Sequence, residues 1–221
     1  MKEYKIEFVS DHILINDDRG SKVLLDTGSP STFHAGGLVV LDGKTYNVPT
    51  SYQGVDSTYA TQHVGTALSG LVGMDILGCC GGLLVDVPGG RVVFGYPADG
   101  MTRVAPSMSG DRVKMEMEIR SRRVMVLLDT GAPTSYVSRS LTEGLDIVEY
   151  REDFNPMIGR FRVPMFDFPA AFAGREFVMR AGNLPLELER MVASCGVEGA
   201  VGMELLKHQP VLIADGVWVN N

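Results

Sequence analysis

Two aspartates, Asp26 and Asp129, are the residues of this chain whose type and setting point most directly to chemistry. Each follows an apolar, strand-like run and begins an Asp-Thr-Gly turn. Aspartate is almost never fully buried without a partner, so a carboxylate placed against a hydrophobic core is unusual. A carboxyl group in such a position is a candidate for proton transfer in catalysis.

The two turns belong to an internal duplication. Residues 23–30 return as residues 126–133, shifted by 103 positions, and residues 69–77 return as residues 198–206, shifted by 129. The second copy therefore has 26 more residues between its two landmarks. One Asp-Thr-Gly in a chain of this length has a chance of roughly one in twenty at average residue usage. Two copies in matching contexts are not explained by chance.

The residues that follow each aspartate suit a tight, internally bonded turn. Gly28 and Gly131 let the backbone turn sharply and bring an amide N–H close to the carboxylate. Thr27 and Thr130 add hydroxyl groups that can satisfy buried backbone groups. These four residues are therefore predicted to support the two aspartates.

The motifs resemble those of the aspartic proteases, both pepsin-like and retropepsin-like. The shared pattern is two apolar residues, Asp-Thr-Gly and Ser or Ala, followed downstream by two apolar residues and a glycine, here Leu71–Gly73 and Ala200–Gly202. In these proteases each half supplies one aspartate to a dyad on a pseudo-twofold axis, and the downstream apolar strand passes behind each catalytic loop. The resemblance implies an all-β, two-lobed acid-protease fold in one chain, with two retropepsin-sized lobes.

The resemblance assigns Asp26 and Asp129 to the dyad of an aspartic endopeptidase. Two carboxylates a few ångströms apart cannot both ionise easily and share one proton, and the aspartic-protease dyad is the standard example. The ionised member would act as general base on a water while the protonated member donates to the scissile carbonyl. This reaction needs no metal or organic cofactor, and none is expected. The resemblance also implies that the Ser29 hydroxyl hydrogen-bonds its neighbouring carboxylate, which Ala132 cannot do, so the two carboxyl groups should be electrostatically unequal.

Two other interpretations stay open. The chain could be a non-catalytic peptide-binding module that keeps the fold and the cleft, or an inactive precursor or subunit that needs a further chain for its flap. Both Asp-Thr-Gly motifs are intact, which favours catalysis. Replacing either aspartate by asparagine should abolish activity without unfolding an enzyme, whereas a pure binder has no activity to lose.

The resemblance also predicts a β-hairpin flap between each Asp-Thr-Gly and its downstream glycine. In the first half only 46 residues separate Asp26 from Gly73. The candidate flap there is residues 50–59, with Tyr52 and Gly54 at its tip.

In the second half, residues 154–161 indicate a longer and more apolar hairpin, with Met157, Ile158 and Gly159 at its tip. Apolar residues at a mobile tip suit the exclusion of water from a bound peptide. An ordinary hairpin packed on the sheet explains each of these residues equally well. If the second half supplies the main flap, the chain reverses the pepsin arrangement.

Composition narrows the partners. A net charge of −7, with a pI near 5.1 and no basic run, argues against nucleic acid as a ligand. No apolar run approaches the roughly 20 residues that span a bilayer. The first residues lack the apolar core of a signal peptide, so the chain as written is expected in the cytoplasm, with a secreted or periplasmic location left open for a trimmed chain. We expect a monomer that binds an extended peptide or protein substrate in a cleft between its lobes.

Metal binding and disulfides are not expected. The four histidines are scattered without paired spacing, which argues against a metal site. The three cysteines, Cys79, Cys80 and Cys195, are an odd number with two adjacent, which is a poor disulfide framework.

The elements that must position the aspartates are mostly strands. Asp42-Gly43 and Pro88-Gly90 each separate two strand-like runs, which is typical of hairpins. Residues 4–9 predict one strand, and residues 161–180 predict several short strands punctuated by Pro164 and by Ala173-Gly174. Many short strands, few helices and frequent turns indicate an all-β chain. The predicted division is an N-terminal lobe over 1–96, a linker over 97–111 rich in turn formers, and a C-terminal lobe over 112–221.

Overall fold

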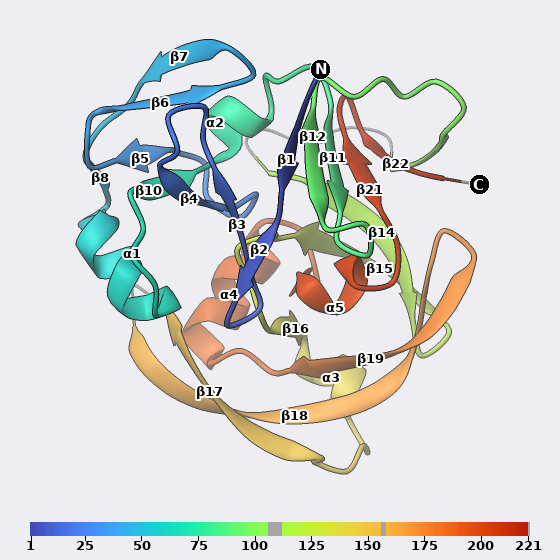
Figure 1. Cartoon of the computed structure of the whole chain (residues 1–221). Coiled ribbons are helices and arrows are strands. Elements are labelled where there is room, and N and C mark those ends of the chain that lie inside the picture. Colours follow the sequence, from blue (N-terminus) through green and yellow to red (C-terminus); the bar gives the residue numbers. More distant parts are fainter. Residues whose placement is uncertain (106–111, 156–157, 221) are drawn as a thin grey trace.

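The computed structural model describes residues 1–105, 112–155 and 158–220. Strands make up 47% of it and helices 14%, which confirms the all-β prediction. Three larger sheets and two small hairpins carry the strands, and the five helices of the described chain are short (Figure 1).

A six-stranded sheet joins the beginning, the middle and the end of the chain. Its strands, in spatial order, are β1 (Lys2–Lys5), β12 (Arg91–Phe94), β11 (Leu83–Asp86), β21 (Val211–Ile213), β22 (Val217–Val219) and β13 (Thr102–Ala105). The two halves therefore meet in one sheet, where β11 pairs antiparallel with β21. Strand β13 lies inside the predicted linker, so that segment is more than a connection: it completes the edge of the sheet by pairing with β22. Residues 106–111 of the linker lie outside the described part of the chain.

A five-stranded sheet belongs to the first half. Its strands, in spatial order, are β2 (Glu7–Val9), β3 (His12–Asn16), β4 (Lys22–Leu25), β10 (Gly70–Val72) and β5 (Phe33–His34). Two hairpins accompany it, made by β6 (Leu38–Leu41) with β7 (Lys44–Asn47) and by β8 (Ser51–Tyr52) with β9 (Val55–Asp56). The β6–β7 hairpin turns at Asp42-Gly43, as predicted.

A seven-stranded sheet belongs to the second half. Its strands, in spatial order, are β14 (Lys114–Ile119), β15 (Arg122–Leu128), β20 (Gly199–Val201), β16 (Ser135–Val137), β19 (Arg175–Gly182), β18 (Gly159–Phe172) and β17 (Glu149–Asn155). The long β17–β18 hairpin sweeps beneath the rest of the molecule in Figure 1 and extends toward α1. The helices are α1 (Ser57–Val64), α2 (Met74–Leu77), α3 (Arg139–Thr142), α4 (Leu186–Ser194) and α5 (Met203–Leu206).

The strand arrangement around each Asp-Thr-Gly is the same in both halves. Strand β4 pairs parallel with β10, which pairs antiparallel with β5. Strand β15 likewise pairs parallel with β20, which pairs antiparallel with β16. The duplicated sequence therefore forms a duplicated three-strand unit, and each unit ends at one of the two aspartates.

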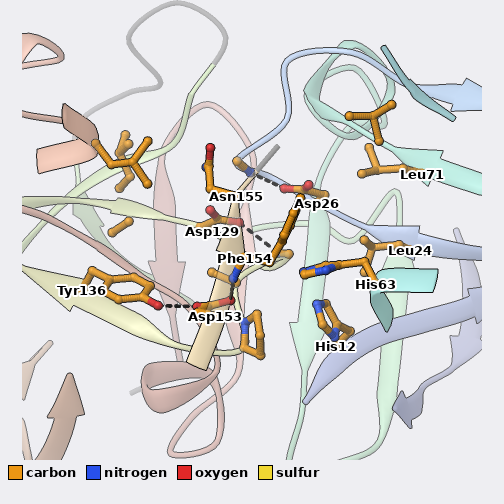
Figure 2. A pocket seen from close by; sticks show the side chains of 18 of the residues that line it. His12, Leu24, Asp26, His63, Leu71, Asp129, Tyr136, Asp153, Phe154 and Asn155 are labelled. Carbon is orange, nitrogen blue, oxygen red and sulfur yellow. Dashed lines mark hydrogen bonds between the residues drawn. The ribbon is translucent and has the colours of Figure 1, made fainter. Parts of the chain in front are cut away.

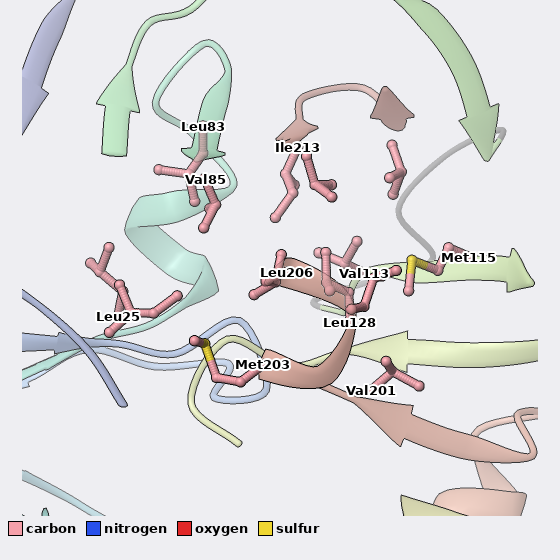
Figure 3. Close-up of a cluster of buried hydrophobic side chains, with 14 of the residues drawn as sticks. Leu25, Leu83, Val85, Val113, Met115, Leu128, Val201, Met203, Leu206 and Ile213 are labelled. Atoms are coloured by element: carbon pink, nitrogen blue, oxygen red, sulfur yellow. The ribbon is translucent and has the colours of Figure 1, made fainter. Parts of the chain in front are cut away.

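The largest cluster of buried hydrophobic side chains is continuous across the two halves (Figure 3). It brings Leu25 and Leu128, which precede the two aspartates, together with Leu83 and Ile213 from the six-stranded sheet. All four are buried almost completely. This shared core holds both aspartate-bearing strands against one sheet.

Two strand predictions are wrong in detail. Residues 4–9 form two strands in different sheets, because the chain leaves β12 at the buried Ile6 and crosses to β3. Strand β18 runs through Pro164 without a break. The Met165 carbonyl accepts the Val148 N–H and therefore faces β17. The backbone groups of the preceding residue, Pro164, face the opposite side, where the pairing with β19 has already ended. The absence of an N–H on proline therefore costs no hydrogen bond between strands.

Candidate active site

The two aspartates stand directly after strands β4 and β15, and the neighbouring strand fixes each backbone. The Asp26 N–H donates to the Val72 carbonyl at 3.0 Å, and the Asp129 N–H donates to the Val201 carbonyl at 2.9 Å. Equivalent bonds to strands β10 and β20 therefore hold both aspartates in equivalent positions.

The two Asp-Thr-Gly loops lock each other through their threonines. The Thr27 N–H donates to Oγ1 of Thr130 and the Thr130 N–H donates to Oγ1 of Thr27, both at 3.0 Å. Each hydroxyl then donates across to the other half, that of Thr27 to the Leu128 carbonyl at 2.7 Å and that of Thr130 to the Leu25 carbonyl at 2.9 Å. Both threonines are 1% exposed, so these four bonds are shielded from water. The predicted role of the hydroxyls is confirmed, and they also join the halves.

This lock brings the two carboxyl groups into contact. Each carboxyl group shifts the pKa of the other, and Figure 2 shows them side by side. A Cβ atom placed on Gly28 would collide with the Asp129 carboxylate, and one placed on Gly131 would collide with that of Asp26. Glycine is thus required at both positions because each turn packs against the other half's carboxylate.

Backbone amides support each carboxylate. Oδ1 of Asp26 accepts the N–H groups of Gly28 at 2.9 Å and Ser29 at 3.0 Å, and Oδ1 of Asp129 accepts that of Gly131 at 3.0 Å. The expected bond from the Ser29 hydroxyl to the carboxylate is absent from the described geometry. That hydroxyl donates instead to the Ser31 carbonyl at 2.9 Å.

The proximity of the two carboxyl groups and their burial disfavour the ionised forms. Loss of hydration raises the pKa of Asp26 well above its ordinary value, and the neighbouring Asp129 charge raises it further. Loss of hydration also raises the pKa of Asp129, while backbone amides and the nearby Arg112 act in the opposite direction. One proton is consequently retained by the pair at pH values where an isolated aspartate would be ionised.

Glycines close the back of each loop. A Cβ on Gly73 would meet the backbone of Ser29 and Ser31, and one on Gly202 would meet the backbone of Ala132 and Asp129. The downstream apolar-apolar-glycine segments therefore pass directly behind the aspartate loops, as the resemblance implied.

A pocket of about 320 Å³ opens over the two carboxylates. Its walls come from both halves and are largely apolar, and they also include the polar side chains of His12, His63, Arg112, Asp153 and Asn155. The first half supplies Leu24, Val55, Tyr59, Ala60, Val64 and Leu71, and the second half supplies Leu127, Tyr136, Phe161, Leu184, Leu188 and Met191.

The β17–β18 hairpin crosses the pocket, and Phe154 and Asn155 near its tip line the pocket. The Phe154 ring lies 4.5 Å from that of His63 and 5.5 Å from that of Tyr59, measured between centroids. Both partners belong to α1 of the first half, and Figure 2 shows Phe154 between the aspartates and His63. Ile158 is exposed and Gly159 begins β18 with φ +79°. Met157 lies outside the described residues.

The first-half flap candidates are placed differently. Tyr52 and Gly54 do form a hairpin, β8–β9, but neither lines the pocket. Tyr52 packs instead on a small core around Leu14 and Phe33. The chain after this hairpin forms helix α1, whose Tyr59 does reach the pocket.

Sequence reasoning missed both pocket helices, although each carries a signal. Asp56 caps α1 by accepting the Tyr59 N–H at 2.8 Å, and Gly65 ends the helix in a left-handed conformation. In α4, Leu188 and Met191 recur at helical spacing after Pro185.

Two negative observations apply to the described ranges. No three His, Cys, Asp or Glu side chains there are grouped so that they could hold a metal ion. None of the helices there is long and apolar enough to cross a bilayer.

Comparison of the sequence with models of known protein families and with curated proteins finds no match.

Proposed function

We propose that the chain is an aspartic endopeptidase, with two similar lobes related by a pseudo-twofold axis between the Asp-Thr-Gly loops. One observation carries the proposal: Asp26 and Asp129, at corresponding positions of a duplicated unit, line one largely apolar pocket, and each carboxylate packs against the glycine of the other's loop. Structural turns have no need for two carboxyl groups in contact, because such a pair costs free energy on burial.

The chemistry follows from the shared proton. The ionised carboxylate takes a proton from a water molecule as the water oxygen attacks the carbonyl carbon of a peptide bond. The protonated carboxyl group donates to the carbonyl oxygen, which yields a neutral tetrahedral intermediate. The dyad then donates its proton to the amide nitrogen and takes a proton from one hydroxyl of the intermediate, so that the carbonyl re-forms as the C–N bond breaks. The products are a carboxylic acid and an amine, and the dyad again holds one proton.

The pocket suits an extended peptide. The β17–β18 hairpin lies over the dyad and contacts α1 on the opposite wall, so a chain threaded beneath it would be shielded from water. Substrates are therefore peptides or unfolded proteins, and the second half provides the flap. Both aspartates come from one chain, so a monomer is sufficient.

The test is cleavage of a mixed, unfolded protein from acid to mildly alkaline pH, with and without a statine-containing peptide that mimics the tetrahedral intermediate. Inhibitable cleavage supports the proposal. Tight binding of that peptide without cleavage at any pH would favour the non-catalytic binding module, and neither cleavage nor binding by folded monomer would reject both.

A further inference from the structure

Asp153 is a carboxylate in the pocket that the proposed reaction does not use. It lies on flap strand β17, is half-buried, and lines the pocket together with the dyad. Oδ2 accepts the hydroxyl of the buried Tyr136, and Oδ1 accepts the Phe154 N–H at 2.7 Å. These two bonds fix the carboxylate in place, on the second-half side of the pocket (Figure 2).

This carboxylate has capacity for a further partner. An ionised carboxylate has about four acceptor sites, and two are used here. No lysine or arginine of the described chain forms an ion pair with Asp153, whereas Arg151 on the same strand pairs with Glu149 at 3.0 Å. Burial is the main cause of the raised pKa of Tyr136 and the Asp153 charge raises it further, while Arg151 acts in the opposite direction.

The imidazoles nearby do not supply the missing cation at neutral pH. His12 and His63 line the same pocket, and loss of hydration lowers the pKa of both, despite the opposing effect of Asp153. Arg112 acts on the other carboxylate, Asp129. Arg160 acts on His63 and, in the described ranges, forms no ion pair with Asp153. The Asp153 carboxylate therefore remains available to a cationic group of a molecule bound in the pocket.

We propose that Asp153 is a specificity residue that binds a cationic nitrogen of the substrate, from a Lys or Arg side chain or from the amino terminus of a peptide. This inference rests on the proposed peptidase function and narrows its substrate class. The apolar walls around Asp153, including Phe161 and Leu188, would hold the aliphatic part of a basic side chain while the carboxylate holds its end. Tyr136 acts as a positioning residue, because it orients the carboxylate.

The probe is a cleaved peptide, acetylated at its amino terminus, that carries Lys, norleucine or Glu at each position in turn. A charge-assisted hydrogen bond at a partly exposed site should favour Lys over norleucine by about tenfold in kcat/KM at one position. A second arm compares acetylated and free amino termini on the norleucine peptide, which separates the two sources of the cation. The preference should also shrink as ionic strength rises.

Asp153→Asn should remove the preference, since asparagine keeps the shape but loses the charge. Glu152→Gln is the matched control: it removes the same charge from the adjacent, exposed residue and should leave the preference intact. Absence of any preference for a cation, or its persistence in Asp153→Asn, would overturn the inference. If Asp153→Asn does not fold, the salt dependence of the Lys preference in the natural chain is the test, and a preference that does not shrink as ionic strength rises would overturn the inference. If the natural chain cleaves no peptide, the proposed function fails, and calorimetric binding of the same peptides tests the inference separately.

Discussion

The threonine lock between the two loops should be a major contributor to stability, and Thr27→Val tests it. Valine has nearly the same shape but removes the hydroxyl that donates to the Leu128 carbonyl and accepts the Thr130 N–H. Both of these backbone groups are left buried without a partner. An unsatisfied buried group costs about 1–3 kcal/mol, so the loss of two partners should lower the free energy of unfolding by about 2–6 kcal/mol.

Urea denaturation measures this loss, with a thermal scan alongside. For a chain of this size each kcal/mol lowers Tm by about 2–4 °C. Thr27→Ser retains the hydroxyl and should lose less than about 1.5 kcal/mol, while Thr45→Val, on the exposed face of β7, should change little. A loss in Thr27→Val no greater than in Thr45→Val would refute the argument that the hydroxyl carries the lock.

Three further outcomes follow from the site. Because the folded pKa of Asp26 is raised, the folded state holds more protons than the unfolded state above pH 3.8, so the free energy of unfolding should fall as pH rises toward that raised pKa. Denaturation across pH 4–8 should show a smaller fall in Asp129→Asn, which lacks the neighbouring charge. A fall as large as that of the natural chain would contradict the coupling. Gly131→Ala should abolish cleavage of any substrate by pushing its Cβ into the Asp26 carboxylate, and retained activity would show that the loops are farther apart. Phe154→Ala removes the contact between the flap and α1 and should raise KM by about tenfold, measured by initial-rate kinetics. An unchanged KM would show that this contact does not contribute to substrate binding.

Much of the site could be predicted from sequence because its geometry is local. The turn at each aspartate depends on the glycine two residues later, and the resemblance implied that a downstream apolar strand would pass behind each loop. The predicted acceptor of the Ser29 hydroxyl was wrong, because the actual acceptor, the Ser31 carbonyl, depends on how the loop continues after the motif.

The walls of the pocket were harder to predict because they depend on contacts between distant segments. Nothing local to Phe154 predicts that its ring meets α1 of the other half. Helix α1 itself was overlooked because its polar, tyrosine-containing sequence has weak helical periodicity, although Asp56 and Gly65 provide the cap signals. The break between β1 and β2 depends likewise on which sheet lies beside Ile6.

The most direct test of the dyad compares kcat/KM on one cleaved peptide for the natural chain, Asp26→Asn, Asp129→Asn and the double variant. If the two carboxyl groups act as one unit, each single variant should lose at least about a thousandfold, and the double variant should lose little more than either single one. Asp11→Asn, an exposed aspartate outside the pocket, should retain full activity. A folded Asp26→Asn or Asp129→Asn variant that keeps activity within tenfold of the natural chain would contradict the account.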